Sequence, residues 1–167
     1  MLRFVLSTLI LGGIAWSCTK GMAAATDEPA EIVNSFNVNS TAILEAVNNV
    51  RQKGCNCGGV KMPPVPPVTW NNQLAQAAYN HSKEMHAKRF FNHNSRNGAS
   101  PGDRIRAAGY TWKAYGENIA LHNTDEAGVV DGWLRSPSHC KTIMSPLYKE
   151  MGVGRSGSYW TQDFGAK

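Results

Sequence analysis

Two stretches of the chain carry apolar residues at the three- and four-residue spacing of an amphipathic helix. The first runs over residues 40–53 and ends at Gly54, and the second runs over residues 70–88. The residues on the two stripes are Ile43, Val47, Val50, Leu74, Ala78, His81 and Met85. We therefore expect two helices here, and we interpret His81 as a core histidine that is hydrogen-bonded to the backbone.

The second half of the chain alternates short helical patterns with strand patterns. Residues 101–108 begin with proline and precede a glycine, which favours a short helix. Residues 115–121 are strand-like, and Thr124 can cap a further helix. Residues 151–155 and 158–164 predict two strands joined by a tight turn. The apolar face of the helix after Thr124 consists of Val129, Val130, Trp133 and Leu134. This order predicts an α+β fold in which helices cover an antiparallel sheet.

The first 25 residues have the pattern of an export signal. Arg3 precedes an apolar run at residues 4–16, which is shorter than the roughly 20 residues that span a bilayer and is typical of a signal peptide. Two processing routes stay open: lipidation of Cys18, which would anchor the protein to a membrane, or cleavage after Ala25. The expected parts are an export region at 1–25, a polar tether at 26–39 and one domain at 40–167.

Charge adds one exclusion. The formal net charge is +5, and the lysines and arginines are spread along the chain without a basic cluster. Nucleic-acid binding needs a concentrated basic face, so we expect no nucleic-acid partner. We expect an exported protein in the periplasm, outside the cell or anchored as a lipoprotein.

Three cysteines lie within the expected domain, at Cys55, Cys57 and Cys140. A disulfide is the default in an oxidising compartment. A bridge between Cys55 and Cys57 would strain the backbone, so one of them should pair with Cys140. The third thiol is then free or pairs with another chain. The alternative is a metal site of all three thiolates, although zinc ligands are usually spaced further apart than Cys-x-Cys.

Five motifs follow one another between residues 40 and 165. They are Val68-Thr69-Trp70-Asn71 leading to His81, Phe91-Asn92-His93, Pro101-Gly102-Asp103-Arg104, Gly116-Glu117-Asn118-Ile119-Ala120, and Trp133-Leu134-Arg135-Ser136-Pro137-Ser138-His139 with Met151-Gly152-Val153-Gly154 behind it. In this order and spacing the chain resembles bacterial members of the CAP superfamily, which comprises cysteine-rich secretory proteins, antigen 5 and plant pathogenesis-related proteins. The shared domain is also called the SCP domain.

The resemblance implies a three-layer α-β-α sandwich with an antiparallel sheet and a central cleft. In the family this cleft is lined by two histidines and two acidic residues. By motif, His93 and His139 match the histidines and Glu117 matches the first acid. Ser136 occupies the position of the second acid, so the set is incomplete, which weakens any mechanism that needs two carboxylates.

Two structural contacts are also expected. The resemblance favours a disulfide between Cys57 and Cys140, because bacterial relatives often have a cysteine before glycine in the first turn and another just after the second histidine. We interpret Arg104 as one partner of a structural salt bridge.

The cofactor that the cleft residues could hold is zinc or another divalent metal. His93 and His139 would be its ligands by resemblance. Two imidazoles and the carboxylate of Glu117 also match a three-ligand site with an open position for water. Alternatively, Glu117 orients one of the histidines from behind.

Three functions are open on this basis. The first is a non-catalytic binding module for a lipid or an extracellular protein, which the incomplete acid set favours. The second is a metal-assisted hydrolase, in which the metal would acidify water and Glu117 would be the base. The third is a structural protein of the cell envelope.

Overall fold

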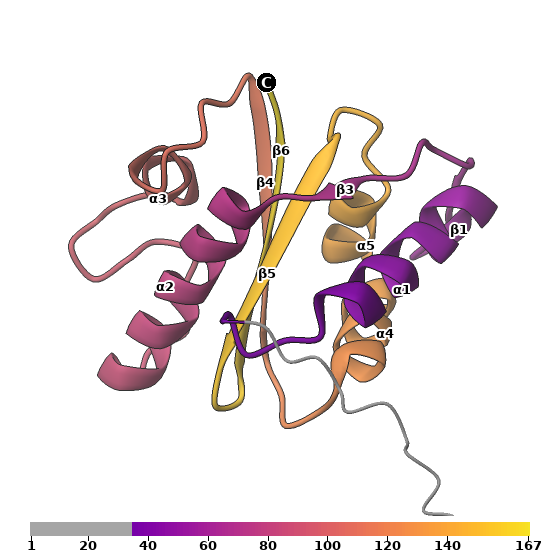
Figure 1. Cartoon of the computed structure of the whole chain (residues 1–167). Coiled ribbons are helices and arrows are strands. Elements are labelled where there is room, and N and C mark those ends of the chain that lie inside the picture. Colours follow the sequence, from indigo (N-terminus) through magenta and orange to yellow (C-terminus); the bar gives the residue numbers. More distant parts are fainter. Residues whose placement is uncertain (1–34) are drawn as a thin grey trace, which may run out of the picture. The chain divides into compact units, whose positions relative to one another are not determined.

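The computed structural model describes residues 35–167, and the elements of this part of the chain are drawn in Figure 1. The helices are α1 (Ser40–Lys53), α2 (Asn72–Lys88), α3 (Pro101–Ala107), α4 (Glu126–Arg135) and α5 (Pro137–Ile143). The strands are β1 (Cys55–Cys57), β2 (Val60–Met62), β3 (Thr69–Trp70), β4 (Ala114–Leu121), β5 (Glu150–Ser156) and β6 (Tyr159–Ala166). The α+β class predicted from the sequence is confirmed.

Polar caps explain where the helices begin. The Asn71 side chain accepts from the backbone N–H of Leu74 at 3.2 Å, so α2 begins at Asn72 and not at Trp70 as the apolar stripe predicted. Helix α4 is capped by Asp125, whose Oδ1 accepts from Gly128 N at 2.8 Å. The expected cap at Thr124 was therefore wrong by one residue.

The main sheet has the strand order β3-β5-β6-β4. Strands β4, β5 and β6 are antiparallel, whereas the short β3 pairs parallel to β5, so the antiparallel sheet expected from the sequence has one parallel pair at its edge. Strand β4 forms the other edge, and β1 and β2 form a separate two-stranded hairpin.

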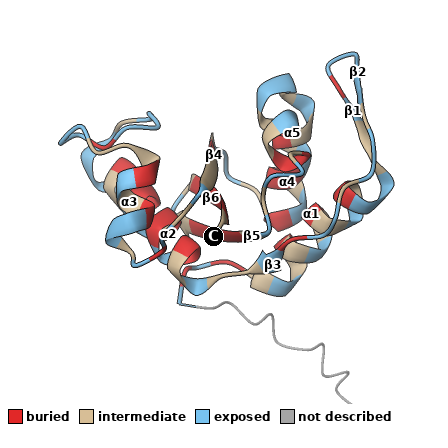
Figure 2. Ribbon diagram, turned by 90° about the horizontal axis from the view of Figure 1, so that it is seen from above, coloured by how far each residue is buried: buried red, intermediate tan, exposed pale blue. Residues whose placement is uncertain are grey.

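Helices cover both faces of the sheet, as the resemblance implied. Figures 1 and 2 show α2 and α3 on one side of the sheet and α1, α4 and α5 on the other. Strand alternation separates the two layers. On β5, Met151 and Val153 join the core beneath α1 and α4, whereas Gly152 and Gly154 face α2, where an added Cβ would lie 2.0 Å and 2.3 Å from backbone atoms of Ala75 and Tyr79. Helix α2 therefore lies directly on the strand backbone.

The domain begins before residue 40. Phe36 is 8% exposed and Val38 is fully buried in the main core, and Phe36 O accepts from Arg155 N at 3.0 Å. Residues 36–39 are therefore part of the domain and not of a tether, because both apolar side chains belong to its main core and the Phe36 ring meets Tyr79 of α2 edge-on at 6.2 Å. The remaining expectations for the N-terminal region, a signal peptide, lipidation of Cys18 and cleavage after Ala25, lie outside the described residues. Within residues 35–167, no helix has the length and apolar character needed to cross a membrane.

Candidate functional site

His93 and Glu117 form a hydrogen-bonded pair. His93 lies in the loop between α2 and α3, and Glu117 lies in β4. His93 Nδ1 is 2.7 Å from Glu117 Oε1. An ionised carboxylate only accepts, so the proton of the neutral imidazole lies on Nδ1 and Nε2 is left as an acceptor. The side chain of His93 is 50% exposed and that of Glu117 is 1% exposed, so a buried carboxylate orients a solvent-facing imidazole.

Arg104 binds the other oxygen of the same carboxylate. Its NH2 group donates to Glu117 Oε2, and the Arg104 side chain is 10% exposed. Its NH1 group donates to His93 O at 2.8 Å and to Ala99 O at 3.2 Å. The salt bridge expected for Arg104 is therefore present. It ties the loop that carries His93 to strand β4.

A buried histidine holds the same loop from α2. His81 is fully buried and its Nε2 donates to Asn92 O at 2.9 Å, which confirms the core histidine predicted from the helical stripe. Burial, with a smaller effect from the Arg104 guanidinium, lowers the pKa of His81. His81 is therefore neutral at physiological pH and acts as a fixed donor beside His93.

A second carboxyl group lies beneath Glu117. Asp163 of β6 is the direct cross-strand partner of Glu117 and is fully buried. Burial, and then the charge of Glu117, raises the pKa of Asp163 well above its ordinary value. Two carboxylates cannot hydrogen-bond to each other without a proton. Because Glu117 already accepts from His93 and Arg104, the proton belongs on Asp163, and its O–H can donate only to Glu117 or remain without a partner.

His139 approaches from the opposite layer. It lies in α5, and its backbone oxygen accepts from Asn118 Nδ2 at 3.3 Å. Glu117 and Asn118 are neighbours on β4 and point to opposite faces, so the histidines come from opposite sides of the free edge strand. Burial, followed by the nearby His93, lowers the pKa of His139. This places the two histidines within electrostatic range of each other across the edge.

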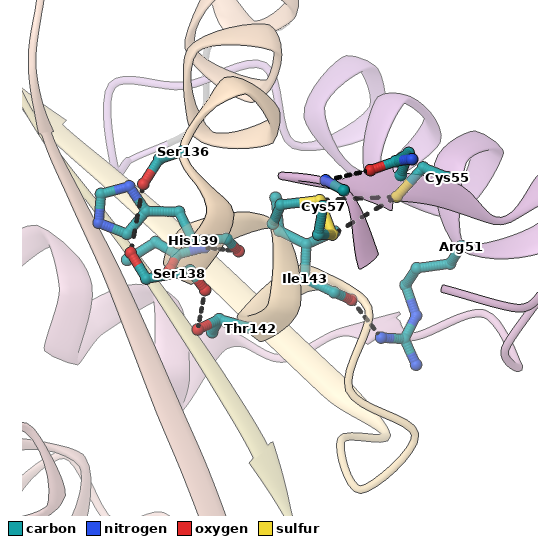
Figure 3. The surroundings of a disulfide bond; sticks show 12 residues. Arg51, Cys55, Cys57, Ser136, Ser138, His139, Thr142 and Ile143 are labelled. Atoms are coloured by element: carbon teal, nitrogen blue, oxygen red, sulfur yellow. Dashed lines mark hydrogen bonds between the residues drawn. A yellow bond between two sulfur atoms is a disulfide. The ribbon is translucent and has the colours of Figure 1, made fainter. Parts of the chain in front are cut away.

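Ser136 precedes α5 and lies alongside His139 (Figure 3). Its Oγ is 3.2 Å from Ser138 Oγ. In Figure 3 the His139 ring points away from the disulfide, alongside these two serines. The hydroxyl at the expected second-acid position therefore pairs locally. The lining of a cleft by His93, Glu117, His139 and Ser136 stays a prediction from the resemblance.

The donor set fits two metal ligands better than three. Both oxygens of Glu117 are engaged by His93 and Arg104, so Glu117 orients His93 and is not free to coordinate. Among residues 35–167, the group of three or more metal-binding side chains with ligand atoms within 4.8 Å is Cys55, Cys57 and Cys140, and it does not include the histidines. A three-ligand site of His93, Glu117 and His139 is therefore not preassembled.

The disulfide implied by the resemblance is present. Cys57 and Cys140 are bonded with a Cα–Cα distance of 5.5 Å, and Cys55 is the free cysteine of the described residues. The bridge fastens the β1–β2 hairpin to α5, the helix that carries His139 (Figure 3).

Asp163 is the site residue that the sequence analysis missed. The signal for it was the pair Gln162-Asp163 in the last strand. Neighbouring residues of a strand face opposite ways, so in a sheet covered on both faces both polar groups must be buried. Asn118 Nδ2 donates to Gln162 Oε1 at 3.0 Å on one face, and Asp163 faces Glu117 on the other.

Comparison with known proteins agrees with this fold. The family model described as the cysteine-rich secretory protein family matches residues 44–164. The uncharacterized protein YkwD of Bacillus subtilis (strain 168) is 33% identical over 144 residues, which is 85% of this chain and 52% of YkwD. The uncharacterized membrane protein YlbC of the same organism is 35% identical over 97 residues, 58% of this chain and 28% of YlbC. The chain thus spans about half of the first relative and less of the second.

Solved structures show the same architecture. An extracellular protein containing an SCP domain from Bacillus anthracis str. Ames superposes with a TM-score of 0.68 at 29% identity, over 76% of this chain and 40% of that chain. An outer surface protein from Borrelia burgdorferi superposes with a TM-score of 0.65 at 18% identity, over 76% of this chain and 91% of that chain. The second likeness supports the fold alone.

Proposed function

Because the chain belongs to the cysteine-rich secretory protein family, we propose that it is an exported, non-catalytic binding module whose ligand contacts His93 and His139 at the free edge of β4. This proposal rests on one observation: both carboxylate oxygens of Glu117 already accept hydrogen bonds. One oxygen holds His93 and the other holds Arg104. Glu117 therefore positions a binding group, and it is not available as a base for a hydrolytic water.

The hydroxyl groups support a binding role in the same way. Hydrolysis through a covalent enzyme intermediate needs a nucleophilic side chain within hydrogen-bond reach of its base. The serines nearest to His139 in sequence, Ser136 and Ser138, pair with each other. Ser156 does contact a histidine, His86, at 3.0 Å, but that ring stacks on Tyr159 at the surface.

Export is supported by the disulfide and by a related structure. Disulfides persist in oxidising compartments, and the SCP-domain protein of Bacillus anthracis that superposes at 29% identity is described as extracellular. We extend the proposal to a signal peptide at residues 1–25 and to membrane attachment through a lipid on Cys18, with cleavage after Ala25 as the alternative. Labelling with a radioactive fatty acid, lost in Cys18→Ser, distinguishes the two.

The test compares three forms of the full chain: wild type, the His93→Ala/His139→Ala double variant, and His86→Ala as a matched control at an exposed histidine. Lipid is sought by solvent extraction and by sedimentation with phospholipid vesicles, and protein ligands by crosslinking on intact cells. We expect a ligand that is lost in the double variant and retained in the control. Calorimetric titration with zinc tests whether the two imidazoles also form a metal site.

Other outcomes point elsewhere. Hydrolysis of peptide, ester or cell-wall substrates that the double variant abolishes would overturn the binding proposal in favour of a hydrolase. A ligand bound equally well by all three forms would place binding outside this site. If deletion of the gene causes a cell-envelope defect and the double variant fully complements it, the structural role would be favoured.

A further inference from the structure

Three sulfur atoms lie together at the end of the β1–β2 hairpin, away from the histidines. The free Cys55 Sγ is 3.6 Å from Cys140 Sγ and 3.8 Å from Cys57 Sγ, the two atoms of the disulfide. Figure 3 shows the Cys55 sulfur beside this bond. We propose that the three cysteines form a thiol–disulfide exchange site, in which Cys55 attacks Cys140 and opens the buried bridge to external low-molecular-weight thiols.

Accessibility distinguishes the three sulfurs. Cys57 and Cys140 are fully buried, whereas Cys55 is partly exposed. An external thiol therefore cannot reach the native bridge directly. If the bridge moves to Cys55 and Cys140, one of its two sulfurs belongs to the partly exposed residue, and the bond becomes open to attack from solvent.

The surroundings give Cys55 room to react. Its sulfur is nearly equidistant from the two bonded atoms, so it lies beside the disulfide and not in line with it. Attack requires the three sulfurs to line up, which a rotation of the Cys55 side chain can achieve. A cavity of about 190 Å³, lined in part by Cys55, Val50, Leu134 and Cys140, adjoins the cluster and leaves space for that rotation.

Geometry also selects the product. A bond between Cys55 and Cys57 would join residues separated by a single position, which strains the backbone. A bond between Cys55 and Cys140 keeps the hairpin fastened to α5. Cys140 is therefore the sulfur attacked, and Cys57 is the leaving group.

The exchange balances without an oxidant or a reductant. The Cys55 thiol gives its proton to water, and the thiolate forms a bond to Cys140 Sγ. The bond between Cys57 and Cys140 breaks, and Cys57 leaves as a thiolate that takes up a proton. An external thiolate can then attack Cys55 Sγ, which forms a mixed disulfide at Cys55 and releases the Cys140 thiolate.

Protonation keeps this site slow at neutral pH. Burial raises the pKa of the Cys55 thiol, and only a thiolate attacks. The charged groups that line the cavities around Cys55 are Lys53 of α1 and Lys61 of β2, while α4 and α5 contribute the uncharged Leu134 and Cys140. The exchange rate should rise about tenfold per pH unit until the thiol titrates.

The test uses the full chain with Cys18→Ser, so that three sulfurs contribute. The protein is incubated between pH 7 and 10, quenched in acid and alkylated, and the labelled cysteine is identified by peptide mass spectrometry. We expect the label to move from Cys55 to Cys57 at a rate that increases with pH. A label that stays on Cys55 at every pH overturns the proposal.

Two variants in the same background test the exchange geometry without relying on movement of the label. In Cys57→Ser incubated with oxidised glutathione, which takes up the two electrons and two protons, Cys55 and Cys140 should form a bridge and leave no free thiol. Two free thiols in the folded, oxidised variant would contradict the exchange geometry. In Cys55→Ser, a monothiol should reduce the native bridge at least about tenfold more slowly than in the parent, because the accessible sulfur is gone. Equal reduction rates would mean that the buried bridge is attacked directly.

Discussion

Glu117 of β4 and Asp163 of β6 are direct cross-strand partners, and both carboxyl groups are buried on the face of the sheet covered by α2 and α3. One guanidinium, from Arg104, serves the pair. The arrangement is therefore balanced only when one of the two acids holds a proton. This single proton sets the charge beneath the His93 imidazole.

Asp163→Asn should stabilise the protein at neutral pH. The folded-state pKa of Asp163 is raised, so above the ordinary aspartate value of about 3.9 wild type loses stability as pH rises toward the folded-state pKa. Asparagine is neutral and can donate to Glu117. We expect a gain of roughly 1–3 kcal/mol at pH 7, the usual cost of a buried unsatisfied polar group, measured by urea unfolding. A loss of stability at pH 7 would contradict a protonated Asp163.

Arg104→Ala should be strongly destabilising. The change leaves the Glu117 carboxylate buried without its cation, and breaking a buried pair in this way typically costs about 3–5 kcal/mol. The control is Arg135→Ala, which removes an ion pair with Asp131 whose side chains are 68% and 62% exposed. Exposed pairs contribute about 0–1 kcal/mol. Equal unfolding free energies for the two variants would contradict a structural role for Arg104.

His81→Gln should reduce the loss of stability in mild acid. The folded-state pKa of His81 is lowered, so its contribution is present above the unfolded value of about 6.5 and is lost as pH falls through the folded-state value. Glutamine can still donate to Asn92 O and does not titrate. Between pH 7 and pH 5 the melting temperature of the variant should fall less than that of wild type. Part of the fall remains, because the pKa of His139 is lowered as well. His86→Gln, at an exposed site, should decline as steeply as wild type.

Gly152→Ala should disrupt the contact between α2 and β5. Its Cβ would lie 2.0 Å from Ala75 N, and backbone atoms cannot yield as a flexible side chain can. We expect a loss of about 1–3 kcal/mol or more, as for overpacked cores. The matched change Gly132→Ala meets open space within α4 and should gain up to about 1 kcal/mol. Calorimetric unfolding of both variants checks the two signs, and a neutral Gly152→Ala would contradict the close approach.

Helices α1 to α4 could be predicted because an apolar stripe, a capping residue or an N-terminal proline marks each of them. Helix α5 could not, since it has seven residues and no side-chain cap. The strands β1, β2 and β3 could not, since each has three residues or fewer and depends on a partner. Phe36 and Val38 were missed for a related reason: two apolar residues in a polar segment have no period, and only the folded core reveals that they are buried.

The site was predictable as far as the motifs reached. His93 and Glu117 were identified by resemblance, and the structure brings them into contact. That Glu117 orients His93 and does not bind a metal followed only from the position of Arg104. The sequence does not tell how many donors surround one carboxylate. Asp163 could be recognised as a site residue only from the strand register, which pairs it with Glu117. The two residues are far apart in sequence, and hydrophobic periodicity reports only on neighbouring positions.

The strand order determines when the sheet can form as the chain is synthesised. Both outer strands, β3 and β4, pair only with strands from the last hairpin of the chain, β5 and β6. A nascent chain that ends before Glu150 therefore has no partner for either of them, however much of it has been made. The four-stranded sheet can therefore assemble only when the residues from Glu150 onward are available, so the last hairpin of the chain completes the whole sheet at once.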